Sequence, residues 1–302
     1  MHRRNFLYQT GLLAGASLLF QQKAMSQLLG TQQGQIRMLR RNVGIYTERG
    51  GTIGFAITGD GIIVIDSQFP EQAGHFIEQV KKESAQPFTY LLNTHHHGDH
   101  TAGNIAFKEL VKNVVAHENA ALHQKANAEK GGSLDKQLLP DVTFKDEFKL
   151  KLGDEKVKAS YFGAGHTNGD AMYLFEEADV VHMGDLMFNK RHPFVDRSAG
   201  ANMANWIKVL HKAADEYGKK TIYIFGHSAN PGEETGTAED LKLFAAYLGQ
   251  VLQFAEKEFK RGVSKEEFIK NTSIPGNTLW GGQGIERPLT AAYEEVSSRT
   301  NV

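Results

Sequence analysis

The 302-residue sequence contains no cysteine, so it has no disulfide and no thiolate ligand for a metal. It also lacks an excess of either charge, since 34 Lys and Arg residues stand against 35 Asp and Glu residues. A net charge of −1 provides no basic field that would collect nucleic acid, and we expect no nucleic-acid partner. The 40% of hydrophobic residues predict a sizeable folded core.

The N-terminus lacks an apolar run long enough to span a bilayer comfortably. The run 11–20 is short, follows a basic start and precedes small residues at Ala24 and Ser26. This pattern predicts a signal peptide over residues 1–26 rather than an anchor. We therefore expect an exported, periplasmic protein with no stable membrane insertion after cleavage, and retention of the signal as a membrane tether is the alternative.

The basic start contains the pair Arg3 and Arg4, followed by Asn-Phe-Leu. It resembles the twin-arginine export signal, whose passengers cross the membrane already folded. An ordinary secretory signal that happens to hold two arginines is the alternative.

Residues 27–302 are predicted to form a single domain of alternating strands and helices. Apolar and β-branched stretches between glycine turns predict strands at 36–47, 52–58, 61–66, 88–92, 142–152, 156–162, 171–175, 180–183 and 221–225. Helical spacing predicts helices at 71–84, 102–110, 118–128 and 205–217. C-terminal helices follow from about residue 237, where Thr237 and Asp240 form a capping box, and their apolar stripe is assigned to the core.

The stretch NTHHHGDH concentrates metal-binding side chains directly after the predicted strand 88–92. His95 and His97 are two residues apart, so their rings can converge, and Asp99 and His100 follow closely enough to serve a second point in space. Imidazole and carboxylate are ligands that zinc, iron and manganese prefer. The sequence therefore predicts a metal site on this loop.

Three later positions combine glycine with a possible ligand directly after a strand. They are Gly165-His166, Gly184-Asp185 and Gly226-His227. Glycine lets the backbone turn tightly there, so that a ligand can be aimed inward from the strand end.

Together these motifs resemble the metallo-β-lactamase fold superfamily, because HHHGDH fits its HxHxDH signature and the three later motifs follow in order. The resemblance extends to about Pro231 and implies an α/β (α+β) fold, a four-layer αββα sandwich with the metal site at one edge of the two sheets. It also implies two sets of ligands and a bridging carboxylate: His95, His97 and His166 for one metal, Asp99, His100 and His227 for the other, and Asp185 between them.

Departures from subfamilies narrow the expected activity. β-Lactamases with a cysteine ligand are excluded by composition, and Asp185 argues against the subclass that lacks a bridging carboxylate. The full set is similar to glyoxalase II, lactonases and sulfatase-like members. Persulfide dioxygenases share the HxHxDH line with a single iron, which keeps an oxidative alternative open.

We expect a zinc-dependent hydrolase that holds two zinc ions and acts on a small ester, lactone, thioester or amide. Two divalent metals lower the pKa of a bridging water to about 7, and Asp99 is the predicted catalytic residue that orients this nucleophile and handles its proton. The alternatives are a mononuclear iron enzyme of sulfur oxidation and a non-catalytic periplasmic metal-binding protein. Fe or Mn is the alternative to zinc as the bound metal. Nothing in the residues predicts an oligomeric state.

The loop after Asp185 carries charged residues close in sequence to the metal motifs. Arg191, His192 and Asp196 are predicted to contact a polar or anionic small-molecule substrate, with Lys190 beside them. An ordinary solvated loop is the alternative. His96 falls at a variable position of the signature and is expected to support the ligands or face solvent.

Overall fold

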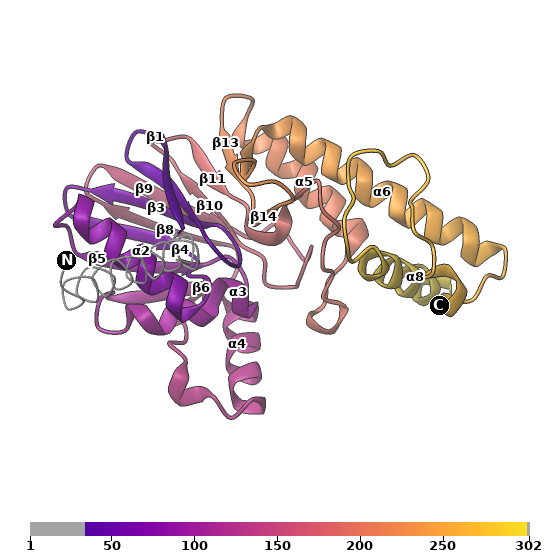
Figure 1. The fold of residues 1–302 in the computed structure, drawn as a ribbon, viewed down its shortest axis with the longest axis horizontal. Helices are drawn as coiled ribbons and strands as arrows, with labels where there is room; N and C mark the ends of the chain where they lie inside the picture. The colour runs from indigo at the N-terminus through magenta and orange to yellow at the C-terminus, as the bar shows by residue number, and fades with distance from the viewer. Residues whose placement is uncertain (1–33, 301–302) are drawn as a thin grey trace, which may run out of the picture. The chain divides into compact units, whose positions relative to one another are not determined.

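Two β-sheets form the centre of the fold (Figure 1). The computed structural model describes residues 34–300, so the predicted signal at residues 1–26 lies outside the described residues. The first sheet follows chain order: β1 (Gln35–Arg40), β2 (Val43–Thr47), β3 (Ile53–Thr58), β4 (Gly61–Ile65), β5 (Phe88–Asn93), β6 (Asn113–His117) and β7 (Val142–Phe144).

The second sheet has the order β15-β13-β11-β10-β9-β8. Its strands are β8 (Glu147–Leu152), β9 (Glu155–Ser160), β10 (Met172–Phe175), β11 (Val180–His182), β13 (Ile222–Ile224) and β15 (Thr235–Gly236). Two short strands, β12 (Phe188–Asn189) and β14 (His227–Ser228), pair with each other in parallel.

Alternation along the strands separates three apolar layers. In β4, Ile63 and Ile65 face the second sheet, whereas Ile62 and Val64 face the helices on the other side. In β13, Ile224 faces the first sheet. Because side chains alternate across a strand, each sheet buries both faces, and the layers are helix, sheet, sheet, helix. The predicted fold class is confirmed.

The outer helices differ between the two sides. The long helix α2 (Pro70–Glu83), with proline in its first turn, packs Phe76 and Val80 on the first sheet, and α4 (Glu118–Lys130) follows β6. On the other side α5 (Met203–Tyr217) packs beside the second sheet, α6 (Ala238–Lys260) packs on α5, and α8 (Glu286–Thr300) packs on α6 farther from the sheets (Figure 1). The short α7 (Lys265–Phe268) lies between α6 and α8 in sequence. The predicted capping box of α6 is present.

Two predicted strands are each divided in the structure. The strand predicted over 36–47 becomes the hairpin of β1 and β2, because Arg41 turns the chain with a positive φ of 52°. The strand predicted over 142–152 becomes β7 and β8, which lie in different sheets. The exposed pair Lys145 and Asp146 carries the chain from one sheet to the other. Both predictions were wrong because polar residues made these turns without glycine or proline.

The region between residues 102 and 117 also differs from the prediction. The helix predicted over 102–110 is a short 3₁₀ segment, η1 (Ala102–Phe107). No strand was predicted for residues 113–117, which form β6. This strand pairs in parallel with β5 and β7. It is five residues long and four of them are buried, so it shows no alternation of polar and apolar residues.

Hydrogen bonds between the sheets cluster at one edge. The Thr52 amide donates to the Gly226 carbonyl (2.9 Å), and His182 Nε2 donates to the Thr52 carbonyl (2.9 Å). The Tyr173 hydroxyl donates to the Asn93 carbonyl (2.9 Å). These bonds join the strand ends that carry the predicted ligand loops, so both sheets position the same site.

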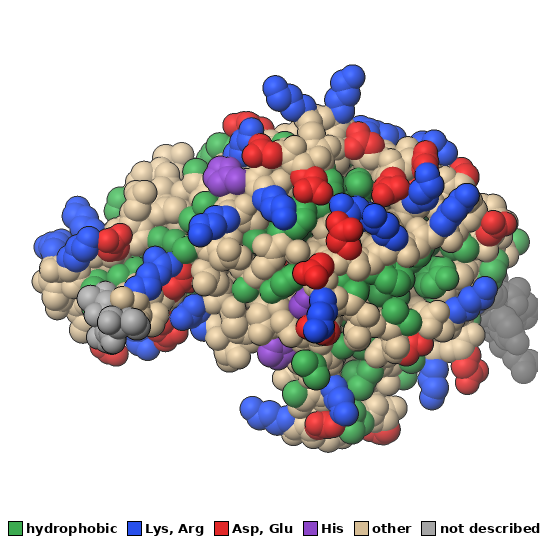
Figure 2. All heavy atoms as spheres, turned by 180° about the vertical axis from the view of Figure 1, so that it is seen from behind, with side chains coloured by type: hydrophobic (Ala, Val, Ile, Leu, Met, Phe, Trp, Pro, Cys, Tyr) green, Lys and Arg blue, Asp and Glu red, His purple; other side chains and the backbone are tan. Residues whose placement is uncertain are grey.

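The charged surface shows no area of one sign on the face in Figure 2, where Lys and Arg alternate with Asp and Glu. Within residues 34–300, no helix combines the length and apolar character needed to cross a membrane.

The N-terminus of α5 is capped by a carboxylate from α8. Glu295, whose side chain is 4% exposed, accepts hydrogen bonds from the amides of Met203 (2.7 Å) and Ala204 (3.1 Å). A buried carboxylate at this end satisfies amides that have no partner in the helix and complements the helix dipole.

We predict that Glu295→Ala lowers the free energy of unfolding by about 1–3 kcal/mol, because the buried Met203 amide and the part-buried Ala204 amide lose their acceptor. Urea unfolding followed by circular dichroism measures this. The neighbouring Glu294 is the control: its side chain is 39% exposed and pairs with Lys265, so Glu294→Ala should cost about 0–1 kcal/mol. Equal losses in both variants would contradict the capping role.

Candidate metal centre

The histidine cluster occupies the loop between β5 and the short helix α3 (Gly98–Thr101). The buried strand delivers the chain to the sheet edge, and the amides of His100 and Thr101 both donate to the His97 carbonyl (3.0 and 3.1 Å). This tight turn places His95 and His97 on one side and Asp99 and His100 on the other.

The second sheet contributes the remaining predicted ligands. His166 lies in the connection between β9 and β10, Asp185 lies in the 3₁₀ turn η3 (Gly184–Leu186) after β11, and His227 begins β14. The structure brings all seven predicted metal ligands to one edge of the two sheets.

The first cluster consists of three imidazole nitrogens. His97 Nδ1 lies 3.1 Å from His95 Nε2 and 2.8 Å from His166 Nε2. The rings of His95 and His166 are fully buried, whereas His97 keeps 17% of its side chain exposed.

The second cluster consists of Asp99, His100 and His227. His227 Nε2 lies 3.1 Å from Asp99 Oδ2 and 3.4 Å from His100 Nε2. Asp99 is the most exposed of the seven ligands, with 33% of its side chain accessible. This cluster therefore has an open side where a substrate can approach.

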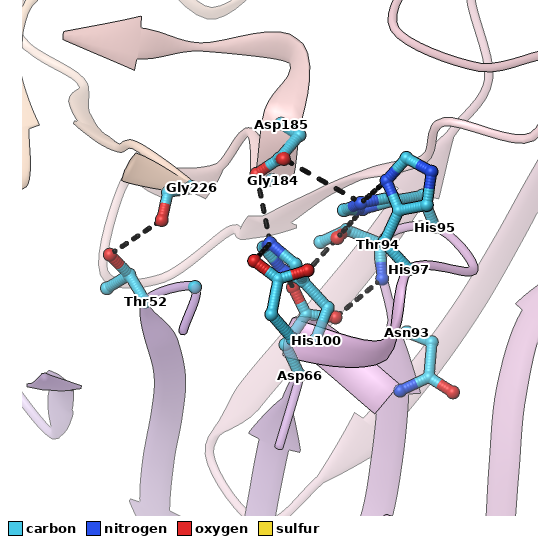
Figure 3. A network of polar contacts seen from close by, with 12 residues as sticks. Thr52, Asp66, Asn93, Thr94, His95, His97, His100, Gly184, Asp185 and Gly226 are labelled. Atoms are coloured by element: carbon cyan, nitrogen blue, oxygen red, sulfur yellow. Dashed lines mark hydrogen bonds and ion pairs between the residues drawn. The ribbon is translucent and has the colours of Figure 1, made fainter. Parts of the chain in front are cut away.

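Asp185 lies between the clusters and turns one oxygen toward each (Figure 3). Its Oδ1 is 3.0 Å from His100 Nε2 and 3.4 Å from His227 Nε2, while its Oδ2 is 3.5 Å from His166 Nε2 and 3.8 Å from His95 Nε2. Its Oδ1 is buried and makes no hydrogen bond of good geometry.

These distances fit metal ions better than hydrogen bonds. Four ligand atoms placed about 2.0–2.1 Å from a tetrahedral zinc lie about 3.3 Å from one another, close to the separations in both clusters. Three converging imidazole nitrogens also cannot all donate to one another, because a neutral ring has a single N–H. The donor set of nitrogen and oxygen suits zinc, iron or manganese.

Four of the rings have their far nitrogen fixed by an oxygen. His95 Nδ1 contacts the Thr94 hydroxyl (3.0 Å), and His166 Nδ1 donates to the Phe194 carbonyl (2.9 Å). The other two donate to carboxylates: His97 Nε2 to Asp196 (2.9 Å) and His100 Nδ1 to Asp66 (2.7 Å). Such contacts fix the orientation of each ring and which of its nitrogens faces the cluster.

The two clusters differ in their electrostatics. Burial and the neighbouring His97 lower the pKa of His166 to about 3, so this ring is neutral. Burial also lowers the pKa of His100, but the carboxylates of Asp185, Asp66 and Asp99 together raise it well above its usual range. The first cluster therefore offers imidazole nitrogens without a carboxylate of its own, whereas the second is surrounded by carboxylates.

Two glycines allow close approach to the ligands. A Cβ at Gly51 would lie 2.1 Å from His100 Cε1, and a Cβ at Gly226 would lie 2.2 Å from Asp185 Oδ1. No larger residue fits at either position without displacing a ligand, which explains the glycine of the Gly226-His227 motif.

Two residues that support the ligands were missed or assigned differently in the sequence analysis. Asp66 follows β4, is fully buried, and accepts from Thr94 as well as from His100. Its signal was a carboxylate at the end of an apolar strand, without glycine beside it. Asp196 was predicted to contact substrate, but its carboxylate is hydrogen-bonded to His97 and lies 3.6 Å from His96 Nε2.

The other candidate substrate residues are distributed around β12. His192 is buried, with its Nδ1 2.7 Å from the Tyr247 hydroxyl, so it anchors its loop to α6. Arg191 and Lys190 are exposed. His96 is buried beside Asp196, in agreement with a supporting role.

This αββα arrangement with clustered histidines and aspartates at the sheet edge defines a class of metal-binding proteins. The model of the metallo-beta-lactamase superfamily matches residues 46–241, and the chain belongs to this superfamily.

Two hydrolases are similar in sequence to parts of the chain. The metallo-beta-lactamase type 2 of Bacillus cereus is 26% identical over 203 residues, which cover 64% of this chain and 75% of that protein. The hydroxyacylglutathione hydrolase of Francisella tularensis subsp. tularensis is 34% identical over 127 residues, 42% of this chain and 43% of that protein. By name these homologues are hydrolases.

Solved structures share the fold. A metallo-beta-lactamase from Pontibacter korlensis superposes with a TM-score of 0.61 at 20% identity and covers 72% of this chain and 99% of that chain. A double mutant of the sec-alkyl sulfatase PisA1 gives a TM-score of 0.70 at 12% identity and covers 86% of this chain and 50% of that chain.

We predict that Asp66→Asn lowers zinc affinity by about 10–100-fold at the second cluster, because His100 loses the carboxylate that orients it. Competition with a chromogenic chelator measures the affinity of each equivalent. Asp60→Asn in the exposed β3–β4 turn is the control and should bind as the wild type does. Unchanged affinity in Asp66→Asn would mean that the carboxylate only holds the loop.

We predict that Asp196→Asn weakens the first cluster instead, by about 10–100-fold, because His97 loses its charged acceptor. The same competition should show one weakened and one normal equivalent. Asp154→Asn, whose side chain is 64% exposed and pairs with Arg41, serves as the control. A loss in both equivalents would contradict an effect routed through His97 alone.

Proposed function

We propose that this protein is an exported hydrolase that depends on two zinc ions and cleaves a small ester, lactone, thioester or amide. The observation that carries the proposal is Asp185, which turns one carboxylate oxygen toward each of two ligand clusters. A carboxylate in this position serves two cations at once, and a single structural zinc would not need it.

Zinc ions bound to the two clusters would supply a hydroxide near neutral pH and a positive charge that polarises the substrate carbonyl. The chain's own residues perform the positioning. Asp66 and Asp196 fix the rings of His100 and His97, and Asp185 sets the spacing of the two clusters.

Asp99 is the residue proposed to handle the proton. Its Oδ2 faces His227 at 3.1 Å, and its side chain is one-third exposed. Burial raises the pKa of Asp99, but the opposing effect of His100 and His227 is larger and brings it down to about 2. The group is therefore a carboxylate at neutral pH. An ionised carboxylate at the open side can orient the attacking water and pass its proton onward.

The surroundings support reaction with a partly apolar substrate. The Phe194 ring stands 5.4 Å from His97 and 6.1 Å from His166, and 42% of the residue is exposed. Since its carbonyl accepts from His166 Nδ1, the backbone of Phe194 is held beside the first cluster. An acyl or leaving group next to the metals would contact this ring and be shielded from water.

The names of the relatives support hydrolysis over the two alternatives. Both are called after hydrolytic activities. A mononuclear iron enzyme would leave Asp99 and His227 without a metal-binding role, and a protein that only stores metal would not require an exposed carboxylate beside the cluster.

We predict that protein purified without added metal contains about two zinc ions per chain and hydrolyses at least one substrate in a panel of chromogenic esters, lactones, thioesters and a cephalosporin. Asp99→Ala should reduce kcat by at least about 100-fold. Elemental analysis and initial rates measure these quantities. Asp154→Asn is the surface control. One iron per chain and no hydrolysis would overturn the proposal.

A further inference from the structure

A cavity of about 470 Å³ lies against β14, the short strand that begins with the ligand His227. Three segments line it: the end of the β12 loop, the residues after His227, and a stretch of the C-terminal region. The lining residues are Lys190, Arg191, Ser228, Ala229, Asn230, Leu279, Gly281, Gly282 and Gln283.

The cavity is connected to the metal centre through β12 and β14. Phe188 pairs with His227 in this two-stranded ribbon, and their rings stack with centroids 5.3 Å apart. Ser228, the residue after the ligand, is part of the cavity wall. The cavity wall therefore begins one residue after a ligand of the second cluster.

Arg191 is the cation in this cavity without a protein partner. Within residues 34–300, no hydrogen bond or ion pair involves its guanidinium, whereas its neighbour Lys190 pairs with Glu233 at 3.0 Å. Glu233 is further engaged by Asn230 at 3.1 Å. Glu233, the carboxylate that pairs with Lys190, is thus occupied, and Arg191 remains available for a ligand.

The outer wall is held in place from the protein interior. Trp280 is buried, stacks on Tyr247 with centroids 5.2 Å apart, and donates from Nε1 to the Phe188 carbonyl (2.9 Å). The next residue, Gly281, forms a bridge with Arg191. The wall at 279–283 is therefore fixed against both Arg191 and the strand that packs on His227.

This wall lies outside the part of the chain that matches the superfamily model, which ends at residue 241. The metal ligands are all inside the matched part. The cavity is thus a feature that the C-terminal region of this chain adds to the metal centre.

We propose that this cavity is a subsite for a monoanionic group of the substrate, a carboxylate or a sulfate, with Arg191 as the anchor and residues 279–283 as the wall. This inference rests on the proposed hydrolase function and names its substrate class: an ester or lactone that carries a negative charge at a distance from the scissile bond. Arg191 suits the task because a guanidinium offers two parallel N–H donors to two oxygens. The side chains of Ser228, Asn230 and Gln283 supply polar surroundings, and the half-exposed Leu279 contacts an apolar spacer.

The first experiment compares two esters of nearly equal shape, mono-4-nitrophenyl glutarate and 4-nitrophenyl valerate. Water cleaves each to 4-nitrophenol and the acid, and only the glutarate ester carries a distant carboxylate. The zinc-loaded wild type should prefer the glutarate ester by at least about tenfold in kcat/KM. Arg191→Ala should reduce this preference by about 10–100-fold, mainly through KM, and Arg191→Lys should retain part of it.

Lys190→Ala is the matched control, since it removes a neighbouring cation that is already paired and should change the preference by no more than about twofold. An equal loss in both variants would assign the effect to a diffuse positive field and overturn the subsite. So would an unchanged preference in Arg191→Ala. Zinc content, measured for every variant, shows that the metal centre is intact.

A second experiment measures binding without turnover. Isothermal titration of the zinc-loaded protein should show glutarate binding at least about tenfold more tightly than valerate, and this difference should vanish in Arg191→Ala. If neither ester is hydrolysed but the binding difference is present, the subsite stands and the hydrolase proposal fails. If hydrolysis occurs without any binding difference, the hydrolase proposal stands and the subsite is wrong.

Discussion

The site depends on one constraint: five imidazole rings and two carboxylates are crowded together where their own hydrogen bonds cannot satisfy them. Burial lowers the pKa of His95 and of His166, so these rings are neutral. The facing ring nitrogens of the first cluster lie about 3 Å apart. Buried lone pairs that face one another are stable together when a cation lies between them. Asp185 turns one oxygen toward each cluster, so the arrangement favours a cation in each of the two clusters.

The arrangement around the clusters follows from this requirement. The ring nitrogen that faces away from the cluster contacts a protein oxygen, or the ring stacks on a neighbouring ring. The nitrogen that faces the cluster is therefore fixed in position. Glycine stands where the backbone has to pass directly against a ligand. The two sheets meet through hydrogen bonds at the same edge, and small errors in their docking would separate the ligand sets.

The sequence alone predicted the features that depend on residues close together in the chain. The loop after β5 holds its ligands within six residues, and the strand-then-glycine pattern located the later three. The layer order was implied by the resemblance to the metallo-β-lactamase fold superfamily, and the strands that bury both faces agree with it. Long-range features were beyond such patterns. Asp66 becomes part of the site only because β4 lies beside β5, and the division between β7 and β8 depends on which sheet each half joins. Asp196 gave a charge in the correct loop, but its partner, His97, is 99 residues away in the chain.

The ligands are divided between the sheets: four come from the loop after β5, and three from connections of the second sheet. A cation that binds only this docked arrangement stabilises it by RT ln(1 + [L]/Kd), since the separated sheets offer no complete site. Each tenfold rise in free metal above Kd then adds about 1.4 kcal/mol to the sandwich. Bound metal would thus stabilise the docking of the two sheets, and the midpoint temperature of unfolding would report the concentration of free metal around the protein.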